Sequence, residues 1–252
     1  QQQSTAAGGF ECRGPTTGAG RARSEGAERA EAAVGVSRIM SIVGGRLPTT
    51  HEAVRELVLR EDAAALEILA GVAAVDDQFL RRTALAVIGQ HPHGRELRAV
   101  ILSALGDPSE YVVRTACEVV EQWGLSEAHN LLLPLLANVN EATRQSAIRA
   151  LGAVWLDADF PLVFRIYTKD LAADVRREAA WVLHRRVSAA DWRTLFDAFS
   201  EDELVRHRVW ACELAGSFSG SEIFPLLSRL ASDPDGHVRK AAARATETIS
   251  SR

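Results

Sequence analysis

The chain has 252 residues, of which 47% are hydrophobic and 25% are charged, and its formal net charge is -4. The hydrophobic fraction is ample for a buried core, and no apolar run approaches the roughly 18 residues that cross a bilayer, so we expect no membrane-spanning segment. The slightly acidic balance disfavours a dedicated nucleic-acid-binding protein, because such proteins usually carry a clear basic excess.

The three cysteines, Cys12, Cys117 and Cys212, show neither metal-ligand nor disulfide-framework spacing. Cys117 and Cys212 fall at equivalent positions of a sequence repeat, where other repeats have small apolar residues. This usage favours a reducing compartment, and we expect a cytoplasmic protein. The positive charge is almost all arginine, with Lys169 and Lys240 as the only lysines, which is typical of a GC-rich bacterial genome.

Residues 1–30 are rich in Gln, Gly, Ser, Thr and Ala and have no apolar periodicity, which predicts a disordered tail or linker. Residues 31–252 are predicted to form one elongated domain. Its first unit, 31–60, contains two apolar segments, Ala32 to Val43 and Glu52 to Arg60, but lacks the turn aspartate and arginine of later units. Terminal units of a repeat protein are normally atypical, because one of their faces meets water.

A repeat with steps of 31 or 32 residues begins at Asp76 and runs to the C-terminus in six units. The turn residues are Asp76, Asp107, Asn138, Asp170, Asp202 and Asp233, and six positions later stand Arg82, Val113, Arg144, Arg176, Arg208 and Arg239. Small or aliphatic residues follow nine and twelve positions after each turn residue. Periods of this length are typical of stacked helix pairs, so the fold class predicted is all-α, an α-solenoid of antiparallel helix pairs.

The segments Asp233 to Ala242 and Asp174 to Ala180 resemble HEAT repeats, particularly the short bacterial HEAT-like type, and the resemblance extends over roughly residues 45–252. It implies a HEAT-like superhelix in which turn aspartates and the arginines six positions later form a ladder of hydrogen bonds. The pairs so implied are Asp170 with Arg176, Asp202 with Arg208, and Asp233 with Arg239. The ladder should be weakest where Asn138 replaces aspartate and Val113 replaces arginine.

No enzyme motif is complete. The segment His51 to Arg55 lacks the second histidine of a zinc-protease motif, and Gly216 to Gly220 has phenylalanine where a nucleophile elbow needs serine. His91-Pro92-His93 offers two imidazoles without further ligands, so we interpret it as a solvent-exposed turn. We therefore expect no catalytic residue, no cofactor and no metal site.

Positions seven, eight and eleven after each turn residue are predicted to share an exposed face of the second helices. Arginine and tryptophan, which are enriched at binding hot spots, recur there. The candidate partner-binding residues are Arg114, Arg149, Arg177, Trp181, Arg185, Trp210, Lys240 and Arg244. Because Glu118, Glu178 and Glu213 are interleaved with them, the alternative is a solvated mixed face with the tryptophans packed between helices.

The function predicted is a non-catalytic scaffold or adaptor that binds a protein or peptide on the concave, second-helix face. The resemblance leaves two alternatives open, because its family has many functions. One is nucleic-acid binding of the kind seen in HEAT-like DNA-glycosylase relatives, and the other is a bilin-lyase-type subunit.

Overall fold

The computed structural model describes residues 47–218 and 222–251. The chain divides into two units, residues 1–47 and 48–252, and the helices named in this section belong to the second. The predicted tail, residues 1–30, and the segment Ala32 to Val43 lie outside the described residues, so the proposed domain division stays a prediction.

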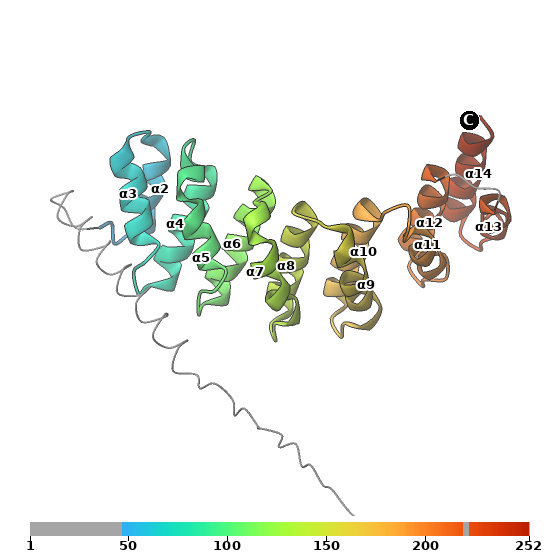
Figure 1. Cartoon of the computed structure of the whole chain (residues 1–252), viewed down its shortest axis with the longest axis horizontal. Coiled ribbons are helices and arrows are strands. Elements are labelled where there is room, and N and C mark those ends of the chain that lie inside the picture. Colours follow the sequence, from blue (N-terminus) through green and yellow to red (C-terminus); the bar gives the residue numbers. More distant parts are fainter. Residues whose placement is uncertain (1–46, 219–221, 252) are drawn as a thin grey trace, which may run out of the picture. The chain divides into compact units, whose positions relative to one another are not determined.

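The described residues form α-helices and short 3-10 helices and contain no strand (Figure 1). The all-α fold predicted from the repeat is therefore confirmed. None of these helices is both long and apolar enough to cross a membrane. The helices are α2 (His51–Glu56), η1 (Leu57–Leu59), α3 (Ala63–Val72), α4 (Gln78–Gln90), η2 (Gly94–Leu97), α5 (Arg98–Ala104), α6 (Glu110–Trp123), η3 (Ser126–Ala128), α7 (His129–Leu132), η4 (Leu133–Ala137), α8 (Glu141–Ala153), η5 (Asp157–Asp159), α9 (Phe160–Lys169), α10 (Ala173–Arg186), α11 (Trp192–Ser200), α12 (Val205–Ser217), α13 (Ile223–Leu230) and α14 (Gly236–Ser250).

Helix pairs follow one another in chain order from α3/α4 to α13/α14 (Figure 1). The second helix of each pair packs on its own first helix and on the second helices of the neighbouring pairs. The exception is the junction between α10 and α12, which touch at few places. The second helices thus form one layer that is interrupted at this junction.

Small residues allow the second helices to pack closely. Ala116, Ala147, Ala179, Ala211 and Ala242 are fully buried, as expected for the ninth position after the turn. Cys117 and Cys212, one position later, are also buried, and burial raises the pKa of each thiol to about 12. Both cysteines therefore act as small apolar core residues.

The ladder arginines bind main-chain carbonyl groups of their own unit, and some also bind the turn aspartate of the next unit. Arg144 donates hydrogen bonds of 2.9 and 2.8 Å to the carboxylate of Asp170 in the next unit, and Arg208 does the same to Asp233 at 2.8 and 3.2 Å. Within its own unit, Arg144 donates only to main-chain carbonyl groups, among them that of Asn138 at 2.8 Å. The implied pairs do form hydrogen bonds, but through the main-chain carbonyl group of the aspartate, as in Arg176 to Asp170 at 2.7 Å and Arg208 to Asp202 at 2.9 Å. The carboxylate that Arg144 or Arg208 binds belongs to the following turn.

The unit that contains α4 makes the same two kinds of contact, but its turn residue and arginine each lie one position earlier in the chain than predicted. Arg81 donates to Asp107 at 2.8 Å and to the carbonyl oxygens of Val75 and Asp76 at 3.0 and 2.7 Å. Val75 is therefore the turn residue, and the predicted pair Asp76 and Arg82 is wrong. Because two aspartates, Asp76 and Asp77, and two arginines, Arg81 and Arg82, are adjacent in the sequence, two registers of the repeat were possible. Asp77 is the N-cap of α4.

Bridged and unbridged junctions alternate along the described repeats. Arginine–aspartate bridges form at Arg81–Asp107, Arg144–Asp170 and Arg208–Asp233. The junction of Val113 with Asn138 has none, as expected from the replaced residues, but Arg176 also forms none with Asp202. That the Val113 junction is the weakest therefore stays a prediction. Glycines follow the same alternation, because Gly89, Gly152 and Gly216 all lie in units that donate a bridge.

Close contact explains two of these glycines, Gly89 and Gly152. A methyl group added at Gly89 would lie 2.8 Å from the Val119 side chain, and one at Gly152 would lie 3.1 Å from Val182. The second helices of bridged units therefore approach each other more closely than a larger residue permits.

The interpretation of His91-Pro92-His93 as a solvent-exposed turn is wrong for His91. Its side chain is buried, with Nε2 2.6 Å from the carbonyl oxygen of Arg60, while Nδ1 accepts a 3.0 Å hydrogen bond from the His93 amide. A proton on Nε2 satisfies both contacts. His91 thus connects the end of α4 to the segment that follows η1.

Candidate functional site

A cavity of about 810 Å³ lies where α10 and α12 separate. Its walls come from the second helices α6, α8, α10 and α12 and from the turn before α12. The lining residues are Glu121, Gln145, Arg149, Asp174, Arg177, Glu178, Trp181, Leu204, Val205, Arg206, His207 and Trp210.

His207 occupies a core position that is aliphatic in most other units. Five positions after the turn residue, the six units carry Leu80, Val112, Thr143, Val175, His207 and Val238. The His207 side chain is only 4% exposed, and its Nδ1 lies 2.9 Å from Oδ2 of Asp202, although the two are not aligned as a hydrogen bond. The hydroxyl of Tyr167 donates to the same Asp202 oxygen.

These contacts account for the missing bridge at this junction. Burial acts to raise the pKa of Asp202, but His207 and Tyr167 outweigh it, and the pKa lies below its ordinary value. Asp202 is thus an ionised carboxylate already engaged by α9 and α12. Arg176 binds only the carbonyl oxygens of Asp170 and Leu171, at 2.7 and 3.1 Å. α10 and α12 contact each other at few places, and the cavity lies between them.

A stack of rings forms the α12 side of the cavity. The indole of Trp210 stacks on His184 at 4.8 Å between ring centroids and on His207 at 5.2 Å, with interplanar angles of 12° and 21°. His207 in turn stacks on Phe199 at 5.3 Å. Burial lowers the pKa of His184 to about 4, so this ring is neutral at neutral pH. Trp210 is consequently held in a fixed orientation.

The opposite wall presents Trp181 of α10, whose side chain is more accessible. Trp181 is 39% exposed, and the guanidinium of Arg185 lies over its ring at 5.1 Å. This cation–π contact fixes the indole without burying it. Leu204 and Val205 add apolar surface at the start of α12.

Most charges in the cavity are already compensated. Arg149 donates to Glu178 at 2.7 Å, and Gln145 donates to the same carboxylate at 3.2 Å. Arg177 pairs with Asp174. Glu121 and Arg206 form no ion pair within the described part of the chain, and burial raises the pKa of Glu121.

The structure brings together some of the predicted partner-binding residues and separates others. Arg149, Arg177, Trp181 and Trp210 line the cavity, and Arg185 lies beside it on Trp181. The remaining three lie elsewhere: Arg114 over Tyr111 at 5.0 Å, Arg244 in a different cavity with Glu213, and Lys240 exposed on α14. A role in binding stays a prediction for all eight residues.

Sequence reasoning missed His207, which sets up the site, and the apolar residues before it, Leu204 and Val205. The signal was present, because His207 is the only histidine at a position otherwise filled by Leu, Val or Thr. Among the described residues, no group of three or more His, Cys, Asp or Glu side chains is placed to hold a metal ion.

Comparison with known proteins defines the class to which this architecture belongs. Solved structures similar to the chain include an archaeal HEAT-like repeats protein from Thermococcus onnurineus NA1, at 17% identity over 82% of this chain and 99% of that one, with a TM-score of 0.51. A designed armadillo repeat protein is similar at 16% identity over 78% of this chain and 99% of that one, also with a TM-score of 0.51. An engineered protein is similar at 18% identity over 86% of this chain and 68% of that one, with a TM-score of 0.54. The fold is thus a helical-repeat solenoid of the HEAT and armadillo type.

Within that class, residues 97–184 match the family model for HEAT repeats, and the predicted resemblance is confirmed. No curated protein matches the chain.

Proposed function

We propose that the chain is a non-catalytic cytoplasmic adaptor that binds a protein or peptide on its second-helix face, with the cavity between α10 and α12 as the anchoring site. The observation that carries this proposal is the pair of oriented indoles, Trp181 and Trp210, on opposite walls of a cavity of about 810 Å³. Ligand sites commonly have volumes of about 300 to 1,000 Å³, and tryptophan is enriched among the residues that dominate binding energy.

The chemistry of the lining favours an apolar or aromatic side chain flanked by polar main chain. Trp181, Trp210, Leu204 and Val205 supply apolar surface for the side chain. The compensated pairs Arg149–Glu178 and Arg177–Asp174 at the rim do not require a charged ligand. Gln145, Glu121 and Arg206 offer donors and acceptors to the peptide groups on either side.

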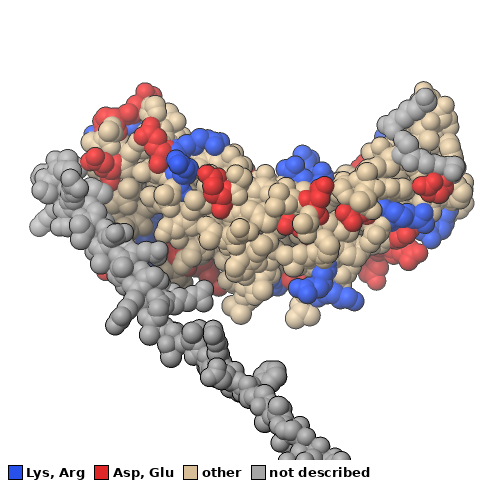
Figure 2. Space-filling view, in the orientation of Figure 1, with Lys and Arg blue, Asp and Glu red and all other residues tan. Residues whose placement is uncertain are grey.

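The charge distribution favours a polypeptide over a nucleic acid. Three acidic and three basic side chains line the cavity: Glu121, Asp174, Glu178, Arg149, Arg177 and Arg206. On the face drawn in Figure 2, acidic and basic side chains are likewise interspersed. A phosphate backbone requires a more continuous basic surface. Neither nucleic-acid binding nor bilin chemistry has a specific observation in its favour.

Selection of displayed random peptides against the full chain tests the proposal. We expect peptides with a shared aromatic or large apolar residue, and we expect Trp181→Ala to weaken their binding by more than about 1 kcal/mol. Tyr111→Ala removes an aromatic ring of similar exposure outside the cavity and should leave affinity unchanged. Thermal melts should show both variants folded, because both side chains are exposed. Selected peptides that bind Trp181→Ala as tightly as the original chain would refute the assignment.

A further inference from the structure

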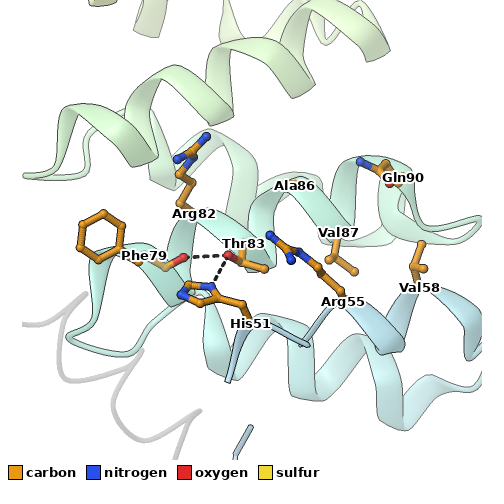
Figure 3. Close-up of a pocket in the computed structure, with 9 residues that line it drawn as sticks. All are labelled: His51, Arg55, Val58, Phe79, Arg82, Thr83, Ala86, Val87 and Gln90. Carbon is orange, nitrogen blue, oxygen red and sulfur yellow. Dashed lines mark hydrogen bonds between the residues drawn. The ribbon is translucent and has the colours of Figure 1, made fainter. Parts of the chain in front are cut away.

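A second cavity, of about 500 Å³, lies between α2 and α4, in the N-terminal part of the described repeats (Figure 3). Its polar lining consists of His51, Arg55, Arg82, Thr83 and Gln90. It shares no residue with the cavity between α10 and α12. The two cavities also differ in charge, because no acidic side chain lines this one.

The two arginines of this cavity take no part in the ion pairs and side-chain hydrogen bonds of the described repeats. Arg81 forms the bridge to Asp107 and caps the turn, so its neighbour Arg82 is left exposed on the second-helix face. Arg55 is likewise exposed on α2. Neither Arg55 nor Arg82 forms an ion pair or a side-chain hydrogen bond with another residue of the described chain, so their guanidinium donors are available to a ligand.

Hydrogen bonds fix the side chain of Thr83, which lies between the two arginines. The hydroxyl of Thr83 donates to the carbonyl oxygen of Phe79 at 2.9 Å, so it accepts the 2.8 Å hydrogen bond from Nδ1 of His51. Figure 3 shows His51 and Arg55 extending from α2 toward Thr83, with Arg82 on the other side of Thr83. Nε2 of His51 makes no hydrogen bond within the described chain, and it becomes a donor when the ring is protonated.

The rest of the lining is apolar. Val58, Ala86 and Val87 supply aliphatic surface, and the Phe79 ring, which is 49% exposed, stands at one end. Phe79 also lies 6.2 Å from Tyr111 between ring centroids. The cavity therefore combines two forked cationic donors with a surface suited to a planar or aliphatic group.

We propose that this cavity binds a small organic anion, a phosphate or carboxylate group joined to an apolar moiety. Arg55 and Arg82 bind the anionic group, because guanidinium matches phosphate and carboxylate with paired hydrogen bonds. The apolar moiety lies against Phe79, Val58 and Val87. This site is independent of the peptide site between α10 and α12, and each proposal can fail without the other.

Titration of the full chain with three small probes tests this inference. Phenyl phosphate and 3-phenylpropionate carry the two anionic groups on a similar ring, and benzylamine carries a cation on that ring. Ligand-observed NMR and calorimetry should show binding of at least one anion and none of benzylamine. The tighter anion then identifies whether the site prefers phosphate or carboxylate.

The double variant Arg55→Gln/Arg82→Gln should weaken anion binding by about tenfold or more, as expected for the loss of charge-assisted hydrogen bonds. Arg98→Gln/Arg193→Gln removes the same charge from exposed positions on the first helices and should leave affinity within about twofold, because distant surface charges are screened. Both variants should retain the helical circular dichroism of the original chain. Equal binding of benzylamine, no binding of either anion, or equal losses in the two double variants would each overturn the proposal.

Discussion

The fifth position after each turn shows how a single side chain determines the packing of a repeat. Leu80, Val112, Val175 and Val238 are buried there, and each lies between neighbouring helices. Thr143 is fully buried at the same position, but its hydroxyl has no hydrogen-bond partner among the residues that the structure describes. Burial of a hydroxyl without a hydrogen-bond partner is destabilising, because the group loses its hydrogen bonds to water and forms none in the protein.

We therefore expect Thr143→Val to raise the free energy of unfolding by about 1 kcal/mol, because it removes an unsatisfied polar group at nearly constant shape. Urea denaturation of the full chain measures the change. The reverse substitution at the equivalent position, Val175→Thr, is the matched control and should destabilise by about 1 to 3 kcal/mol. A loss of stability in Thr143→Val would mean that its hydroxyl has a hydrogen-bond partner after all.

At the scale of the helix pair, a bridging arginine makes two kinds of contact. Arg208 binds the carbonyl oxygens of its own turn at 2.9 and 3.1 Å and the carboxylate of Asp233 in the next unit. Arg176 makes only the first kind of contact. Comparing the loss of stability when each arginine is replaced therefore measures what the bridge between units contributes to the free energy of unfolding.

Arg208→Ala should lower the free energy of unfolding by about 0.5 to 2 kcal/mol, because it removes charge-assisted hydrogen bonds and leaves Asp233 without its partner. Arg176→Ala should have a smaller effect, since no carboxylate loses a partner. Chemical denaturation of the two variants provides the comparison. If Arg176→Ala proves the more damaging, Arg176 contributes to stability through contacts other than a bridge.

The sequence predicted the repeat well because its signals are local. The turn aspartate, the arginine six positions later and the buried alanine all lie within a single unit. Their spacing is repeated from unit to unit, and this repetition alone indicates helix pairs. The carboxylate that each bridging arginine binds could not be predicted from the spacing within one unit, because it lies 25 or 26 residues further on, in the next unit. The cavity beside Trp181 also escaped prediction, because it lies where α10 and α12 contact each other at few places, and no pattern within one unit indicates that spacing.

Across the whole molecule, the bridges make stability depend on pH. Hydrogen bonds from Arg208 lower the pKa of Asp233. Burial acts to raise the pKa of Asp170, but Arg144, the Ala172 amide and Arg176 together hold it below its ordinary value. A carboxyl group whose pKa is lower in the folded state stabilises that state above the unfolded pKa. This contribution is lost as the pH falls through the folded pKa.

Stability should therefore decline as the pH drops below about 4, the ordinary pKa of an aspartate in an unfolded chain. Urea denaturation at a series of pH values measures this decline. The double variant Asp170→Asn/Asp233→Asn should be less stable at neutral pH and should lose less on acidification. An unchanged acid dependence in that variant would show that other carboxylates control it.

The alternation of bridged and unbridged junctions also sets the step by which a protein of this kind can change length during evolution. Loss of the single pair that carries Asp107 would place Arg81 before Asn138, which offers no carboxylate. Loss of two consecutive pairs would place Arg81 before Asp170, and the bridge would survive. Arg81, Arg144 and Arg208 stand 63 and 64 residues apart, so duplication or deletion of a whole four-helix segment would leave each of these arginines facing an aspartate.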